Sequence, residues 1–118
     1  AGDLSMQPEG FARYLQLHLR GLSGENNFVR TDSYEYIHYS QPGFSIGVFN
    51  SEMFGRKFSG MDGSAGTFFC RGIIIPESMF ALAIMTNAGS GTEEMKAVDW
   101  LTLKLVKKYY HWWWKFWM

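Results

Sequence analysis

The chain has 118 residues, of which 47% are hydrophobic and 19% charged, so it can bury one core and forms a single domain or a fragment of a larger one over residues 1–118. Its 11 basic and 11 acidic residues cancel, and the basic ones are scattered except for Lys104, Lys107 and Lys108, which excludes a nucleic-acid-binding surface. No apolar run approaches the about 20 residues that a membrane-spanning helix requires.

The first predicted element is a helix near the N-terminus. Ser5 can cap it, and its first turn tolerates Pro8. Apolar residues then recur near the helical period, at Phe11, Leu15, Leu19 and Leu22. Gly21 and Gly24 are expected to end this helix.

A run of strands is predicted after a polar loop over residues 25–31. The strand-like segments are YEYIHY (34–39), FSIGVF (44–49), MFGRKF (53–58), GTFFCRGIII (66–75) and MFALAIMTN (79–87). KFSGMDGSAGT (57–67) is expected to be a glycine-rich loop between two of them, and Pro76-Glu77-Ser78 suits a hairpin connection. Short links between five strands predict an antiparallel sheet of about five strands.

A long C-terminal helix completes the predicted α+β fold. Ser90 and Glu93 form a capping-box pattern, after which apolar residues keep a helical spacing that would place one face on the sheet. The helix ends in YYHWWWKFWM (109–118). These rings are expected to cover the core; if exposed, they would form a patch for a membrane surface, a partner or a dimer, with Trp112, Trp113, Trp114, Phe116 and Trp117 as its members.

Few residues indicate chemistry on their own. The sequence contains no S-x-x-K, Y-x-N or S-D-N, and the glycine-rich segment lacks the P-loop lysine and following helix. His18, His38 and His111 show no metal-ligand spacing, and the single Cys70 is expected to be a small buried hydrophobe. We therefore expect no metal and no cofactor. Residues 57–67 are either an ordinary turn or a place where the backbone approaches a ligand.

The order of four segments resembles the C-terminal part of the serine β-lactamase-related hydrolases, which include class C β-lactamases, DD-peptidases and esterases. AGDLSMQPEGFARYLQLHLRG is similar to a capped helix of that family, and KFSGMDGSAGTF to the loop that carries its H-[ST]-G or K-[ST]-G triplet. GIIIPESMFALAIMTNAG resembles the next strand pair, and the helix after Ser90 the terminal helix. The resemblance covers nearly the whole chain and implies the last third or so of a longer fold.

The resemblance also implies roles for four residues. Phe58-Ser59-Gly60 stands at the triplet, so Ser59 would present its hydroxyl to a substrate carboxylate, and Gly60 would let the strand approach the ligand. The backbone N–H of Met61 would be an oxyanion-hole donor. Phe58 replaces the family's cation, and Lys57 cannot take its place because consecutive strand residues face opposite ways.

These observations predict the C-terminal segment of a serine hydrolase, supplying one wall of an acyl-transfer site but inactive alone. Its substrate, a small molecule or a peptide, would be bound by the full-length protein, and the family resemblance suggests the periplasm or cell exterior. The alternative is a non-catalytic module that binds peptides, cell-wall fragments or another protein. As a fragment, the chain is expected to self-associate or to be marginally stable.

Overall fold

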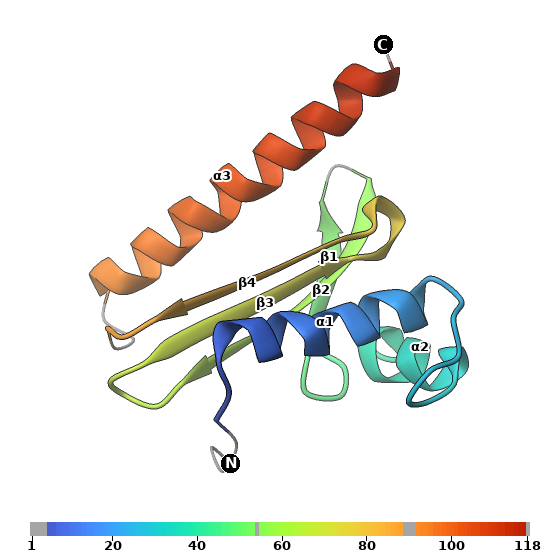
Figure 1. Cartoon of the computed structure of the whole chain (residues 1–118), viewed down its shortest axis with the longest axis horizontal. Coiled ribbons are helices and arrows are strands. Elements are labelled where there is room, and N and C mark those ends of the chain that lie inside the picture. The colour runs from blue at the N-terminus through green and yellow to red at the C-terminus, as the bar shows by residue number, and fades with distance from the viewer. Residues whose placement is uncertain (1–4, 54, 89–91, 118) are drawn as a thin grey trace.

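The computed structural model describes residues 5–53, 55–88 and 92–117, excepting the side chains of residues 53, 92, 94 and 110–117. In chain order the elements are α1 (Pro8–Leu22), α2 (Thr31–Tyr39), β1 (Phe49–Met53), β2 (Arg56–Ser64), β3 (Phe69–Ile75), the 3₁₀ turn η1 (Pro76–Ser78), β4 (Phe80–Thr86) and α3 (Thr92–Trp117). The described strands form one antiparallel sheet in the order β1-β2-β3-β4 (Figure 1). The α+β class and the two flanking helices are confirmed.

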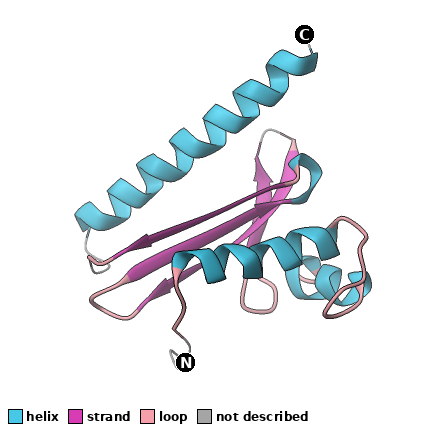
Figure 2. Ribbon diagram, viewed as in Figure 1, coloured by secondary structure: helices cyan, strands magenta, loops and turns pink. Residues whose placement is uncertain are grey.

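The helices cover opposite faces of the sheet. Figure 2 shows α1 and α2 on one side of the strands and α3 on the other. Under α1, a cluster of Phe11, Leu15 and Leu19 packs on Ile74 of β3. Under α3, Val98 and Val106 pack on the other face, against a set of strand residues that includes Phe69, Ile73, Ile75, Leu82 and Ile84. Burial on both faces explains why β3, FCRGIII, is apolar except for Arg71.

The prediction of a strand at YEYIHY (34–39) is wrong, because this segment lies in the helix α2. Its tyrosines favour a strand by propensity, but Tyr34 and His38, four residues apart, lie on one side of a helix and are both buried. The Thr31 hydroxyl donates a hydrogen bond of 2.7 Å to the carbonyl of Gly21, which holds the start of α2 against the end of α1. Tertiary packing thus decides the conformation.

The prediction of a glycine-rich loop over residues 57–67 is also wrong for most of that segment. Residues 57–64 belong to β2, and the turn is confined to Ala65–Phe68, where Ala65 N–H bonds to the Phe68 carbonyl at 3.1 Å. MFGRKF is not a strand of its own, because β1 ends at Met53 and β2 begins at Arg56. The predicted strand at FSIGVF (44–49) is also wrong, because residues 45–48 are irregular and β1 begins at Phe49. The described sheet has four strands rather than five.

The two terminal helices differ from the expectation mainly at their ends. Gln7 rather than Ser5 occupies the N-cap of α1, and the helix continues through Gly21 to Leu22. Gly24 follows in the left-handed region, with φ of 105°, as the residue that ends a helix commonly does. The Ser90 side of the predicted capping box lies outside the described residues, as do the side chains of the predicted aromatic patch.

Candidate functional site

Strand β2 places the four predicted site residues on two different faces of the sheet. Phe58 belongs to the cluster under α3 and lies against Phe49, with 6.3 Å between ring centroids. Ser59 and Met61 face α1 and α2, and Met61 packs against the cluster there. Phe58 and Ser59 therefore do not converge on one site, and Phe58 is partly buried against the core under α3.

Gly60 is held in the sheet by close packing. It pairs with Phe49 of β1, and a Cβ added to it would lie 2.6 Å from the Phe49 ring and 2.9 Å from the Gly72 carbonyl. A side chain cannot be accommodated at such distances without displacing its neighbours. Packing within the sheet thus requires this glycine, whether or not a ligand also approaches it.

The backbone of Met61 is directed into the sheet. Met61 pairs with Gly72 of β3 in a register that runs unbroken to the hairpin, where Ala65 bonds to Phe68. Hydrogen-bonded and non-hydrogen-bonded pairs alternate along an antiparallel ladder, which makes Met61 and Gly72 a hydrogen-bonded pair. The Met61 N–H therefore points toward β3 rather than toward the other edge of β2, and its oxyanion role stays a prediction.

Ser59 is one end of a buried polar chain, centred on His38, that the sequence did not predict. Its Oγ lies 2.6 Å from Nδ1 of His38, and Nε2 of His38 lies 2.7 Å from Nδ1 of His18. The exposed fraction is 0% for Ser59 and His38 and 9% for His18. Residues from β2, α2 and α1 thus meet in one continuous hydrogen-bonded chain inside the protein.

His38 is fixed through both its ring and its backbone. The side-chain amide of Asn50 donates a 2.9 Å hydrogen bond to the His38 carbonyl, and Asn50 is the residue of β1 that pairs with Ser59. One cross-strand pair therefore holds the end of α2 at two points. Aromatic rings enclose His18, with Tyr14 and Tyr34 at 4.5 Å and 5.0 Å between ring centroids.

Burial sets the charge state of the two histidines in this hydrogen-bonded chain. It lowers the pKa of His38 to about 4, and the charge of neighbouring His18 lowers that pKa further. Burial also lowers the pKa of His18. Both imidazoles are therefore neutral at pH 7, with one N–H each. They cannot both be protonated while 2.7 Å apart, because two N–H groups would then face one another.

Tyr39 and Lys57 lie at the border of the polar chain. The Tyr39 hydroxyl is buried without a hydrogen-bond partner, close to Ser59. Burial raises the pKa of its phenol, and the Ser59 hydroxyl partly offsets this rise. The exposed Lys57, two residues before Ser59 on the same face of β2, holds its ammonium 5.6 Å from the Tyr39 ring centroid.

The connectivity is that of a hydroxyl, a base and a third group that orients the base. If the Ser59 hydroxyl donates to Nδ1 of His38, the Nε2–H of His38 donates to Nδ1 of His18, and both contacts have one donor and one acceptor. Since no part of Ser59 is exposed, this arrangement can hold and transfer a proton but cannot attack a substrate. The sequence pattern assigns His18 and His38 to no site, and the only feature they share is an apolar or aromatic neighbour at helical spacing.

Metal-binding groups, the single cysteine and similarity to known proteins add no further site. Among the described residues no group of three or more His, Cys, Asp or Glu side chains is placed to bind a metal ion. Cys70 is free and half-buried on β3, opposite Gly63. Comparisons with family models, curated proteins and solved structures found no match to this chain.

Proposed function

We propose that this chain is the sheet-bearing C-terminal part of a β-lactamase-related serine hydrolase and that it has no acyl-transfer activity by itself. The observation that carries the proposal is the order of elements around the triplet Phe58-Ser59-Gly60. This triplet lies on β2, which is followed by the antiparallel strands β3 and β4 and by the long helix α3 over the sheet. The family resemblance implies the same order.

The lack of activity follows from three features. The sequence contains neither S-x-x-K nor Y-x-N, which would supply the nucleophile and its base. Ser59 is wholly buried and already bonded to His38, and the Met61 N–H is directed toward Gly72. In the complete hydrolase, the reacting groups come from other parts of the protein, and this chain supplies one wall of the cleft. The substrate is a small molecule or a peptide.

The free edge of β4 supports a larger parent fold. Among the described strands, β4 pairs only with β3, and its sequence FALAIMT carries no charge. Such an uncharged open edge is a site for pairing with another strand. A further segment of the parent protein can complete the sheet there, and the isolated chain is expected to self-associate through this edge.

The test compares the isolated chain with the product of its full reading frame. Both are treated with a fluorescent penicillin and with a probe for activated serines, and their intact masses are measured. The proposal expects a longer product that contains S-x-x-K and takes up label, and an isolated chain that takes up none. A full reading frame without these motifs would overturn it.

A second candidate function is a non-catalytic module for peptide, cell-wall-fragment or protein binding. It is favoured by the position of Phe58, because no cation occupies the place where the family binds a substrate carboxylate or holds a proton network. Lys57 is on the Ser59 face, outside the buried chain. A full-length product that binds cell-wall peptides at equilibrium, without labelling by the serine probe and without turnover, is the result expected for this candidate.

A further inference from the structure

All five tryptophans of the chain lie on α3. They occupy positions 100, 112, 113, 114 and 117, and α3 extends over Thr92–Trp117. Figure 1 shows α3 lying alongside the sheet, on the β4 side, and continuing beyond it toward the C-terminus. Tryptophan prefers the boundary between water and lipid, where its ring is half in an apolar environment. This concentration on one helix needs a reason other than the core of the sheet.

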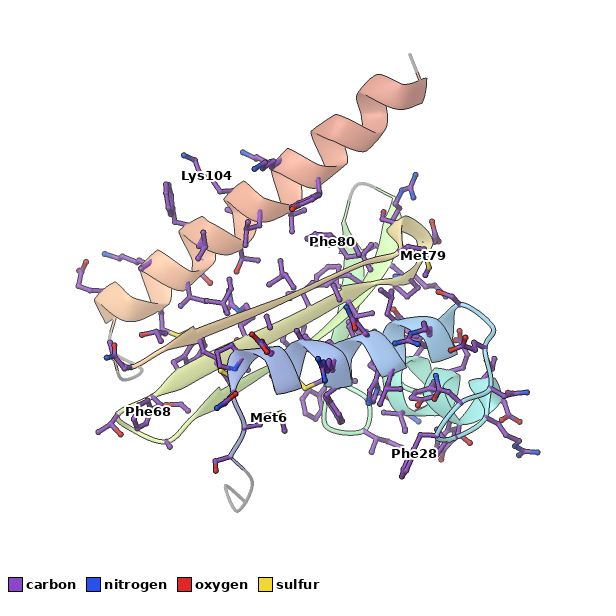
Figure 3. The ribbon with its side chains drawn as sticks, viewed as in Figure 1. Met6, Phe28, Phe68, Met79, Phe80 and Lys104 are labelled. Carbon is purple, nitrogen blue, oxygen red and sulfur yellow. The ribbon has the colours of Figure 1, made fainter. Side chains whose placement is uncertain are left out.

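The outer side of α3 exposes large hydrophobic residues beside lysines. Trp100 is 60% exposed and Leu103 52%, although Val98 and Val106 of the same helix are buried against the sheet. The ammonium of Lys104 lies 4.7 Å from the Trp100 ring centroid. In Figure 3, Lys104 points away from the sheet, whereas Phe80 points from the sheet toward α3. A shallow hollow on this surface is lined by Trp100, Leu101, Lys104, Leu105, Lys107 and Lys108.

The acidic residues of α3 lie in its first part and most of its lysines in its second part. Its three acidic residues, Glu93, Glu94 and Asp99, all precede Trp100. From Trp100 to the last residue the sequence has four lysines and no acidic residue, although the whole chain is balanced with 11 of each sign. Asp99 is already paired with Arg71 at 2.7 Å. The sequence of the second part of α3 is therefore positively charged and rich in tryptophan.

We propose that this part of α3 binds the surface of an anionic lipid bilayer. Trp100 and Leu103 enter the boundary between headgroups and acyl chains, and Lys104, Lys107 and Lys108 contact the negative headgroups. No described helix is long and apolar enough to span a membrane, so the helix lies along the interface. A second copy of the chain bound at this surface would bring two sets of the same lysines together, and their repulsion disfavours a dimer here. The proposal does not depend on the hydrolase assignment.

Vesicle binding with intrinsic tryptophan fluorescence tests the proposal directly. Because every tryptophan is on α3, a blue shift of emission reports insertion of this helix. The chain is mixed with phosphatidylcholine vesicles and with phosphatidylcholine vesicles that contain phosphatidylserine, and then co-sedimented at low and high salt. We expect binding and a blue shift with the anionic vesicles only, and release at high salt.

Two double variants that change the net charge by the same amount test whether vesicle binding depends on the lysines of α3 or only on the net charge of the chain. Lys107→Glu with Lys108→Glu should weaken anionic-vesicle binding by about 25-fold or more, since each lysine near such a surface contributes about fivefold. Arg13→Glu with Arg20→Glu, on the exposed side of α1, should bind within about twofold of the unchanged chain. Circular dichroism checks that both variants are folded. Equal loss in both pairs, equal binding to both vesicles, or dimerisation without vesicle binding would each overturn the proposal.

Discussion

Ser59 and His38 join the sheet to α2 through a buried contact, with Oγ 2.6 Å from Nδ1 and neither residue exposed. Because His38 also contacts His18, this single contact links β2 to both helices on that face. The hydroxyl that the family resemblance assigns to a substrate is here a structural group. The contact therefore governs both the stability of this face and the access to Ser59.

Removing the Ser59 hydroxyl should destabilise the fold. Ser59→Ala leaves Nδ1 of His38 buried without a partner, which costs about 1–3 kcal/mol of unfolding free energy. Ser64→Ala, at the exposed end of the same strand, should change it by less than about 0.5 kcal/mol. Urea unfolding followed by circular dichroism measures both. Equal effects of the two substitutions would show that the His38 contact contributes nothing.

Acid should destabilise the fold through the two buried histidines. The folded pKa of His38 is about 4, below the ordinary histidine value of 6.5, so the unfolded chain takes up protons at a higher pH than the folded one. Stability is then fully present above about pH 6.5 and is lost as the pH falls toward 4, by about 3 kcal/mol. The lowered pKa of His18 acts in the same direction.

His38→Asn provides the control for this pH dependence. Asparagine keeps polar groups at the position but does not titrate, so the variant should be less stable at pH 7 and should show a much shallower decline in acid. Urea unfolding at a series of pH values measures the slope for each protein. A slope that is unchanged in the variant would assign the acid sensitivity to other groups.

Two glycines of α1 should respond oppositely to alanine. A Cβ on Gly21 would lie 2.1 Å from the ring of Tyr34, which is buried, so Gly21→Ala should destabilise the fold by about 1–3 kcal/mol despite the better helix propensity. At Gly10 the nearest atom is 3.7 Å away, so Gly10→Ala should stabilise it by up to about 1 kcal/mol. Thermal unfolding of both variants checks the signs, and destabilisation by Gly10→Ala would contradict this packing.

Arg71 should hold α3 against the sheet. Its guanidinium makes two hydrogen bonds to Asp62 of β2, at 2.8 Å and 3.0 Å, and one to Asp99 of α3, at 2.7 Å. Arg71→Ala should lower the unfolding free energy by about 1–2 kcal/mol, since both carboxylates keep some water contact. Arg71→Lys should recover less than half, because an ammonium cannot bridge both carboxylates. Hydrogen exchange of the α3 amides should rise in both variants, and unchanged exchange would rule out this role.

The sequence predicted elements whose periodicity agrees with their packing. The α1 stripe of Phe11, Leu15 and Leu19 and the apolar residues of β3 and β4 are buried as their spacing predicts. In α3 the expected face is buried only in part, because Val98 is buried but Leu101 is 36% and Tyr109 53% exposed. Prediction failed where tertiary contacts override local preference. The tyrosines of α2 favour a strand, and the glycines of β2 favour a loop, but Gly60 is needed for close packing against Phe49.

The polar chain could not be predicted for a different reason. His18, His38 and Ser59 are separated by 20 and 21 residues along the sequence, so only the packing of α1 and α2 on β2 brings them together. No local sequence motif indicates that these three residues lie close together in space. Neither the strand position of the triplet nor the burial of its serine is predicted by the sequence, because the glycines of residues 57–67 favour a loop and burial depends on helices elsewhere in the chain.

The most direct test of the central claim is to map the covalent label after treatment with an activated-serine probe. The isolated chain, its Ser59→Ala variant and the full reading-frame product are labelled, digested and analysed by mass spectrometry. The account expects label on a serine of an S-x-x-K motif in the longer product and none on the isolated chain. Label on Ser59 of the isolated chain, lost in Ser59→Ala, would contradict it by showing that the buried hydroxyl is an accessible nucleophile.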